Sequence, residues 1–280
     1  MRAATTAASV EPRLAHPLAL VPASMVTGSA VFLYALELQL IGYLVLVLGL
    51  AAAFVLDRSG LSTNLVRDLG LIAAGLVIIS MISVAADISY GNMVLMGAVL
   101  ALAVAVPYLL ARFVFREHLI RFPWRGGDRW GRFQWGYLVF VLVAAWLLLP
   151  FYFITSGVYL NWPTVTEPDE IARLFVGVNA VGIWDELFFI CTVFVLLRRH
   201  FPVLQANLLQ AVVFVAFLWE LGYQAWGPAL TIPFALLQGY IFTRTRSLFY
   251  VICVHLLFDL FVFLIIVHAH NPGALPIFLL

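Results

Sequence analysis

Long apolar stretches alternate with short polar interruptions along most of the chain, from Pro17 to Val267. A helix needs about 20 predominantly apolar residues to cross the hydrocarbon core of a bilayer, so the pattern predicts about nine membrane-spanning helices. Their expected ranges are Leu18–Leu36, Leu40–Leu56, Leu69–Ala86, Met93–Leu110, Trp135–Ile154, Ile171–Leu197, Leu204–Trp226, Ala229–Phe242 and Leu248–His268.

The composition supports the same fold class, because 64% of the 280 residues are hydrophobic and only 10% are charged. Soluble domains carry roughly 25% charged residues, so most of this protein's surface is expected to face lipid. We therefore predict an all-α polytopic helix bundle that is integral to the cell (plasma) membrane, with the lipid bilayer around it. The formal net charge of +1 and the lack of a basic domain argue against a nucleic-acid partner.

The arginines predict the orientation of the chain. Cytoplasmic loops are enriched in Lys and Arg near the ends of the spans. With a cytoplasmic N-terminus, all arginines except Arg173 fall in the N-terminal tail or in the loops Arg58–Arg67, Arg112–Arg132, Arg198–Arg199 and Arg244–Arg246. The segments on the other side are nearly free of positive charge, so we expect the N-terminus to be cytoplasmic.

The two halves of the chain differ in what they place inside the membrane. Residues 1–133 hold about four of the predicted spans and the Arg-rich loop, with almost no charge at bilayer depth. Residues 134–280 place several ionisable groups within their predicted spans. This asymmetry argues against a duplicated transporter with inverted repeats, and it indicates that the C-terminal region is the functional part.

Ionisable side chains in the C-terminal spans are the functional candidates, because such residues are expensive at bilayer depth and usually face the interior of a bundle. Any one of them could be a packing residue that hydrogen-bonds between helices. Their concentration on three spans favours a common site. The set is Asp185 and Glu186 on the sixth span, Glu220 on the seventh, and His255 and Asp259 on the ninth, with the neutral Gln238 on the eighth.

The spacing of these residues allows them to meet. His255 and Asp259 are four residues apart and therefore lie on one helix face. Asp185 and Glu186 point about 100° apart, so we expect one to face the site and the other to orient it or reach a neighbouring helix. At about 1.5 Å per residue, Asp185 and Asp259 lie about 20 Å, and His255 about 14 Å, from the cytoplasmic ends of their helices. Glu220 lies nearer the outer end of its span.

Residues from Leu236 to Leu260 resemble the closing segment of the CPBP family, the CAAX protease and bacteriocin-processing group of intramembrane proteases (Abi/Rce1-like). In that family a Gly-Tyr helix end precedes a turn of the form R-T-x-S-L and a helix with H-x-x-x-N or H-x-x-x-D. The pair Gly239–Tyr240, the turn Arg244–Leu248, and His255 with Asp259 fit this pattern. The resemblance, and with it the protease core, covers roughly residues 171–263.

Two further motifs of the family occur in altered form. Its E-E-x-x-x-R motif corresponds to Asp185 and Glu186, where Asp185 replaces the glutamate that activates water in the family and Ile190 replaces the arginine. Its F-x-x-x-H motif would end at Leu221, which replaces the histidine, and Glu220 stands one position earlier.

The resemblance implies an endopeptidase of glutamate or metal-assisted type that cleaves a membrane-associated protein or peptide. Asp185 or Glu186 would take a proton from water, His255 would orient the nucleophile or stabilise the oxyanion, and Asp259 would fix its position or polarise it. Glu220 would stand in for the missing histidine.

The same residues permit other interpretations. A divalent metal could be held by Glu186, Glu220, His255 and Asp259, since hard oxygen ligands and one imidazole suit such ions, so the cofactor is either none or a metal ion. Buried carboxylates are also what a proton- or cation-coupled transporter uses. A third alternative is a non-catalytic family member that acts as a scaffold or immunity factor.

Overall fold

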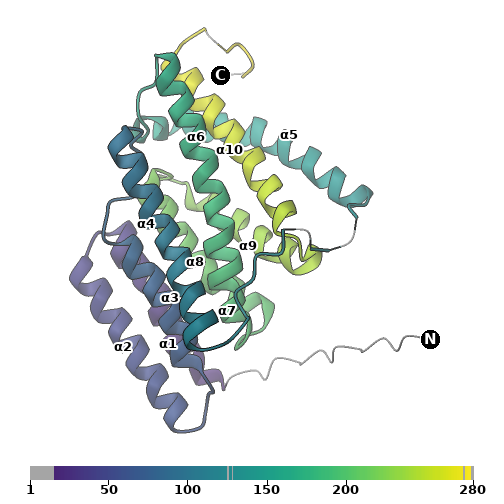
Figure 1. Ribbon diagram of the computed structural model, residues 1–280. Coiled ribbons are helices and arrows are strands. Elements are labelled where there is room, and N and C mark those ends of the chain that lie inside the picture. Colours follow the sequence, from purple (N-terminus) through teal and green to yellow (C-terminus); the bar gives the residue numbers. More distant parts are fainter. Residues whose placement is uncertain (1–15, 125, 128, 274, 279–280) are drawn as a thin grey trace.

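The computed structural model describes residues 16–124, 126–127, 129–273 and 275–278, and helices joined by turns and loops make up this part of the chain (Figure 1). The N-terminal tail used in the orientation argument lies outside the described residues. The α-helices are α1 Leu20–Ala30, α2 Gln39–Arg58, α3 Leu65–Ile79, α4 Tyr90–Leu109, α5 Arg132–Thr155, α6 Pro168–Asp185, α7 Val195–Arg198, α8 Val203–Leu221, α9 Pro228–Thr245 and α10 Leu248–His270.

Shorter helical segments extend several of these helices. Two are 3-10 turns, η1 Pro17–Ala19 and η4 Val158–Asn161. Three have the wider π-helical winding, η2 Val31–Ala35, η3 Leu110–Val114 and η5 Glu186–Phe194. The segment η5 joins α6 to α7, so one continuous helix runs from Pro168 to Arg198.

Seven helices among the described residues are long and apolar enough to cross a membrane, and the all-α class is confirmed. Seven of the nine predicted spans correspond to them. They are Pro17–Ala35, Gln39–Arg58, Tyr90–Val114, Arg132–Thr155, Pro168–Arg198, Val203–Leu221 and Leu248–His270.

The predicted span Leu69–Ala86 differs most from the structure, in which α3 is a 15-residue helix that begins and ends earlier. Its start is fixed by Asp57, whose carboxylate accepts hydrogen bonds from the backbone N–H groups of Leu65 and Val66 at 3.2 and 2.9 Å. At the other end the helix stops before Ser80. Arg67 and Asp68, which the pattern placed before the span, are therefore part of the first turn of this helix.

The eighth predicted span is a helix, α9, but it is not among the seven candidates, since prolines and polar residues interrupt its apolar sequence. The seventh predicted span also ends earlier than expected, at Leu221. Its C-cap, Gly222, has φ +135°, a conformation that ends the helix and that L-residues with a side chain rarely adopt.

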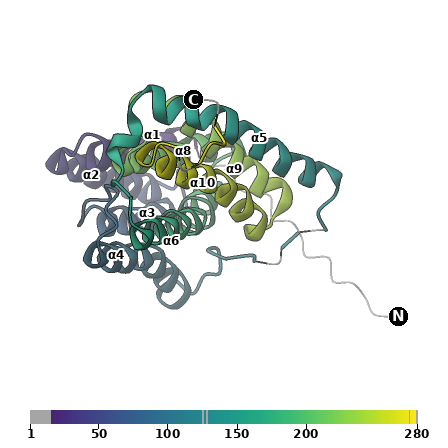
Figure 2. The same cartoon turned by 90° about the horizontal axis from the view of Figure 1, so that it is seen from above.

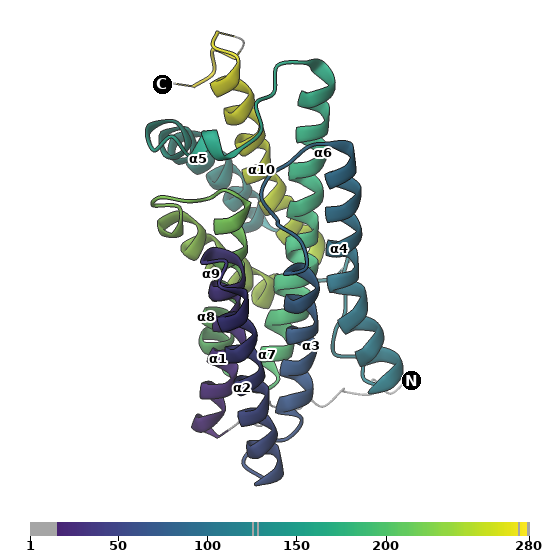
Figure 3. The same ribbon diagram turned by 90° about the vertical axis from the view of Figure 1, so that its left-hand side faces the viewer.

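The helices form a bundle in which α6 and α10 lie side by side near the middle (Figures 1 and 3). The helices α1 and α2 pack together at one edge, α1 also packs on α8, and α9 packs on α8. At the opposite edge α5 leaves the bundle at an angle and packs chiefly on α10, as the view from above shows (Figure 2). The N-terminal helices thus support α8, while α4, α5, α6, α9 and α10 surround the region of the candidate site.

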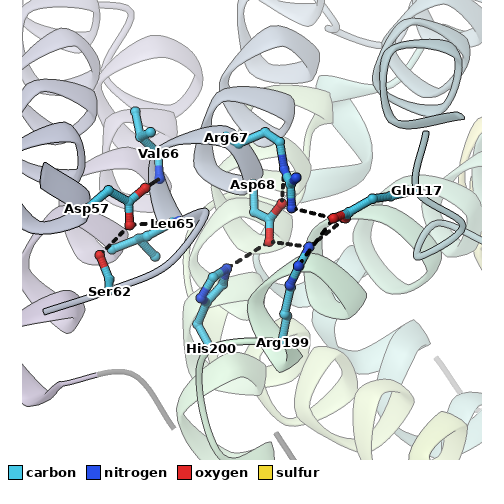
Figure 4. A network of polar contacts seen from close by, with 9 residues as sticks. All are labelled: Asp57, Ser62, Leu65, Val66, Arg67, Asp68, Glu117, Arg199 and His200. Carbon is cyan, nitrogen blue, oxygen red and sulfur yellow. Dashed lines mark hydrogen bonds and ion pairs between the residues drawn. The ribbon is translucent and has the colours of Figure 1, made fainter. Parts of the chain in front are cut away.

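An ion-pair network joins α3, the segment after α4, and the turn before α8 (Figure 4). The buried carboxylate of Asp68 contacts His200 Nε2 at 2.8 Å, Arg67 Nε at 3.2 Å and Arg199 Nη1 at 3.4 Å. Glu117 pairs with the same two arginines, at 2.9 Å to Arg67 and 2.6 Å to Arg199. This network fixes the end of the long helix that carries Asp185 and Glu186 to the N-terminal helices.

The loop before α5 lies against the turn between α9 and α10. The Pro123 carbonyl accepts a hydrogen bond from the backbone N–H of Leu248 at 3.0 Å. A side chain at Gly126 or Gly127 would collide with the carbonyl oxygens of Arg246 and Thr245. Glycine is therefore required here by close backbone approach, and the loop holds the beginning of α10.

Candidate active site

Asp185 and Glu186 lie where the long helix changes from α to π winding. Asp185 is the last residue of α6, and Glu186 is the first of η5. The wider turn is also visible at Thr192, whose hydroxyl donates to the Leu187 carbonyl, five residues back, at 2.9 Å. Segments of π winding inside α-helices are frequently found at functional sites.

The imidazole of His255 lies between the two adjacent carboxylates. Its Nδ1 is 2.7 Å from Glu186 Oε1, and its Nε2 is 3.5 Å from Asp185 Oδ2. Asp259, one turn along α10, places Oδ1 3.9 Å from the same Nε2. Asp185 and Glu186 point in different directions, as expected. Both nevertheless reach His255, at opposite edges of its ring.

Gln238 on α9 completes the support of Glu186. Its amide nitrogen donates to Glu186 Oε1 at 2.7 Å and to the Val251 carbonyl of α10 at 3.0 Å. A hydrogen bond from His255 Nδ1 to the Glu186 carboxylate leaves Nε2 as an acceptor in the neutral ring and as a second donor in the imidazolium. Gln238 and Glu186 together thus fix the position of His255.

Gly182 makes room for Asp259. A Cβ on Gly182, one turn before Asp185, would collide with Asp259 Oδ2. The ring of Phe234 stands edge-on to the imidazole of His255, with the centroids 4.9 Å apart. The four ionisable residues are consequently enclosed by helix backbone and aromatic rings, and each is at most 5% exposed.

The carboxylate oxygens of the cluster outnumber the hydrogen-bond donors that pair with them. Asp185 Oδ1, Glu186 Oε2 and Asp259 Oδ2 are buried and have no hydrogen-bond partner among the described residues. Three carboxyl groups here share one imidazole and one amide donor. Buried polar atoms normally find a partner, so the unpaired oxygens of Asp185 and Asp259, which both lie at the Nε2 edge of His255, indicate a place for water, a proton or a substrate group.

A cavity of about 1000 Å³ opens onto this cluster. Asp185, His255 and Asp259 line it, whereas Glu186 does not. The remaining walls come mainly from apolar side chains of α4, α5, α6, α9 and α10, such as Leu100 and Phe258. The arrangement therefore places a small group of acid–base side chains on the wall of a large apolar cavity, which is typical of ligand sites.

Glu220 does not join the cluster. Its carboxylate accepts a hydrogen bond from the backbone N–H of Val84 at 3.0 Å, in the loop that follows α3. The side chains of α8 that do line the cavity are Phe214, Leu218 and Leu221. The structure thus brings together Asp185, Glu186, His255 and Asp259, and leaves the position of the family's second histidine apolar.

The four ligands that the sequence suggested for a divalent metal, Glu186, Glu220, His255 and Asp259, do not meet at one point. Glu186 approaches the Nδ1 edge of His255, whereas Asp185 and Asp259 lie at the Nε2 edge, so one ion cannot contact all of them. Glu220, the fourth ligand considered, lies elsewhere. Within the part of the chain that the structure describes, no group of three or more His, Cys, Asp and Glu side chains is arranged to hold a metal ion.

Sequence reasoning missed the roles of Gln238 and Gly182. Gln238 stood out only as a neutral polar residue on an apolar helix, and nothing in its spacing identified Glu186 as its partner. Gly182 was one of 19 glycines. Its signal was its place one turn before two adjacent carboxylates, where a small residue permits close approach of another helix.

Comparison with known protein families gives a match to the family described as Rce1-like, type II CAAX prenyl endopeptidase Rce1-like, over residues 167–261. This range contains all four residues of the cluster and nearly coincides with the segment on which the resemblance rested. The first five predicted spans lie outside it. Neither the curated proteins nor the solved structures yield a match to this chain.

Proposed function

Because residues 167–261 form an Rce1-like domain within a multi-pass integral membrane protein, we propose that the chain is an intramembrane endopeptidase whose general base is Asp185. The observation that carries this proposal is the position of Asp185. It lies on the cavity wall, its Oδ2 3.5 Å from His255 Nε2, with one buried carboxylate oxygen unpaired.

In the proposed mechanism each of the four side chains has a separate role. A water molecule between Asp185 and His255 loses a proton to Asp185 while its oxygen bonds to the scissile carbonyl carbon. His255 accepts a hydrogen bond from this water and orients it. The tetrahedral intermediate then collapses, the C–N bond breaks, and the proton on Asp185 passes to the leaving nitrogen. Glu186 lies outside the cavity lining and positions His255 rather than reacting.

Asp259 shares the Nε2 edge of His255 with Asp185. Two carboxylates this close do not both ionise easily in a buried site, since like charges disfavour each other. A proton shared between them keeps one as the base and makes the other a hydrogen-bond donor to water or to the peptide. No step in this sequence requires a metal ion.

The substrate class follows from the walls of the cavity. An opening of about 1000 Å³ lined mainly by apolar groups accommodates a peptide together with a long aliphatic chain, and excludes a strongly polar polypeptide. We infer a membrane-associated protein or peptide, in keeping with the family's CAAX prenyl substrates. The scissile bond would lie beside Asp185 and the aliphatic chain along the apolar wall of α4 and α6.

The test is cleavage of an internally quenched, farnesylated CAAX peptide by the full-length protein in liposomes. Asp185→Asn keeps the size of the side chain and removes the base, so cleavage should fall on the order of 1000-fold. The matched control is Asp169→Asn, which makes the same change on an exposed residue of the same helix. Its activity should equal that of the unmodified protein, and both variants should remain helical and monodisperse.

Two results would contradict the proposal. One is cleavage by Asp185→Asn at the unmodified rate. The other is the absence of cleavage together with pH-dependent ion uptake into the liposomes that Asp185→Asn abolishes, which would favour a coupled transporter instead.

A further inference from the structure

The helices α4 and α6 lie side by side, and two side-chain hydrogen bonds bridge them (Figure 3). Trp184, the residue before Asp185, donates from Nε1 to the Leu100 carbonyl of α4 at 2.7 Å. Nearer the N-terminal ends of both helices, Arg173 donates from Nη1 to the Ile88 carbonyl at 2.7 Å. At about 1.5 Å per residue, the part of α6 between the two bridges is about 16 Å long.

Two glycines face the gap between these bridges, Gly97 on α4 and Gly177 on α6. Both line the cavity of the candidate site. A Cβ at either position would meet no atom of the described residues within 4 Å, whereas a Cβ at Gly182 would collide with Asp259. Gly182 therefore makes room for a side chain of the protein. Gly97 and Gly177 leave room that no side chain fills, although packed helices normally leave little space between them.

The walls of this gap are apolar. The cavity-lining residues between the bridges include Met93 and Met96 of α4 and Val176, Ala180 and Val181 of α6. A polar group placed among these side chains would lose its hydrogen bonds to water without replacement. Methionine side chains are flexible and adapt to apolar partners of irregular shape. The gap is therefore suited to a hydrocarbon chain.

The gap is continuous with the acidic cluster. Asp185 and Asp259, each with a buried oxygen that is unpaired among the described residues, line the same cavity. Because Trp184 precedes Asp185, its bond to α4 fixes where the gap begins relative to the proposed base. Gly97 lies about 5 Å along α4 from Leu100, and Gly177 lies about 12 Å along α6 from Asp185. A chain that starts at the base thus passes Gly97 first and Gly177 later.

The far end of the gap is closed by a charged group. Besides its bond to Ile88, Arg173 pairs with Asp169 Oδ2 at 2.8 Å, and its guanidinium lies over the ring of Tyr90, 4.6 Å from the centroid. An apolar chain that continued further would have to displace this paired guanidinium. The usable length of the gap is therefore limited to the distance between the two bridges.

We propose that the gap between α4 and α6 holds the isoprenoid chain of the substrate, and that Gly97 and Gly177 determine the length of chain accepted. This inference rests on the proposed endopeptidase function. It gives the N-terminal region a part in substrate selection, because α4 lies outside residues 167–261, which match the family. Asp185 remains the base, and the two glycines act on binding alone.

The test compares a farnesylated peptide with a geranylated peptide of the same sequence, which is one isoprene unit shorter, in the liposome assay. Gly177→Leu fills the gap far from the base, so kcat/KM should fall on the order of tenfold for the farnesylated peptide and less than about threefold for the geranylated one. Gly97→Leu fills the gap close to the base and should lower kcat/KM for both peptides by a similar factor.

Gly136→Leu is the matched control. Gly136 lies within α5, a Cβ there would also meet no described atom within 4 Å, and it is not among the described residues that line the cavity. This variant should cleave both peptides at the unmodified rate. Unmodified kcat/KM in both Gly97→Leu and Gly177→Leu would overturn the proposal. An equal loss for a peptide without an isoprenoid chain would also overturn it, because the glycines would then act on the peptide or on the fold.

A binding measurement does not depend on cleavage. A farnesylated peptide with a diazirine at the end of its chain, bound to Asp185→Asn protein in liposomes, should crosslink to α4 and α6 between the two bridges. Adding Gly177→Leu should abolish this crosslink. Labelling of other helices by the peptide would overturn the proposal. So would labelling of the gap by a diazirine phospholipid at the same yield with and without excess farnesylated peptide, because the gap would then hold bilayer lipid.

The two proposals fail separately. If Asp185→Asn abolishes cleavage and the peptide crosslinks elsewhere, the endopeptidase stands and the assignment of the gap is wrong. If Asp185→Asn cleaves at the unmodified rate and the peptide crosslinks within the gap, the proposed base is wrong and the chain site stands.

Discussion

The ion-pair network around Asp68 and the cluster around His255 use similar residues in opposite ways. In the network, Asp68 and Glu117 are matched by Arg67 and Arg199, and His200 adds a further contact to Asp68. Both carboxylates have short, charge-assisted partners. The cluster has three carboxyl groups, and its described part contains no arginine at all.

This difference separates a structural role from a chemical one. A balanced network is bound to its own partners, so it fixes helices relative to one another and has little capacity left for a ligand. The cluster leaves oxygens of Asp185, Glu186 and Asp259 unpaired and faces a cavity. Functional sites commonly keep such unfavourable arrangements, with the surrounding fold supplying the stability they lack.

The largest expected effect on stability is that of Asp68→Asn. It leaves Arg67, Arg199 and His200 without their buried carboxylate. Breaking a buried pair costs about 3–5 kcal/mol, and we expect about 2 kcal/mol here because the two arginines are 17% and 29% exposed and partly solvated. Denaturant unfolding in mild detergent would measure it.

Asp185→Asn supplies the contrast for this measurement. It removes one of several like charges, so stability should stay level or rise while cleavage is lost. Equal destabilisation by both variants would show that the two regions do not differ in the way inferred.

Gln238→Leu should have an intermediate effect. It removes the amide that holds Glu186, and His255 then loses its fixed orientation, so kcat should fall about tenfold with little change in KM. Gln210→Leu is the matched control, because Gln210 is also a buried amide, bonded to Asn207 and the Ala235 carbonyl, outside the cluster. Steady-state kinetics per folded molecule should separate them, and an equal loss of kcat in both would assign Gln238 a packing role only.

The smallest expected effect concerns pH and Glu117. Burial raises the pKa of this carboxyl, but the hydrogen bond and charge of Arg199 and the charge of Arg67 outweigh it and lower the pKa below 4.5. A carboxyl with a lowered folded-state pKa stabilises the fold above its unfolded pKa, and this contribution is lost as the pH falls through the folded value. Glu117→Gln should therefore cost less than about 1 kcal/mol at pH 7.

Unfolding curves at several pH values would check this prediction. The difference in stability between Glu117→Gln and the unmodified protein should shrink as the pH falls below 4.5. A difference that grows on acidification would mean that Glu117 is not held as a charged group by the arginines.

Much of the fold was predictable because lipid imposes a simple rule on sequence. Apolar length identified seven helices that the structure contains, and the i, i+4 spacing placed His255 and Asp259 on one face. The rule failed at α3, where tertiary partners decide the helix limits. Asp57 caps it and the ion-pair network absorbs its polar residues, so residues with a loop-like sequence are helical.

The sequence predicted most of the residues of the candidate site, but not how they are arranged. Four of the five residues meet, whereas Glu220 pairs with a backbone N–H that is 136 residues away in the chain, which no local pattern reveals. The π winding after Asp185 was also invisible, because an almost wholly apolar stretch has no periodicity from which to read the helix type. The cytoplasmic N-terminus remains a prediction.

The close fit of Gly126 and Gly127 against the α9–α10 turn has a practical consequence for anyone who handles this protein. The loop before α5 packs against the start of α10, the helix that carries His255 and Asp259, and holds it in place. An epitope tag, a fusion partner or a protease nick introduced there would loosen that helix from a distance and mimic an inactivating mutation. Such insertions belong at the ends of the chain.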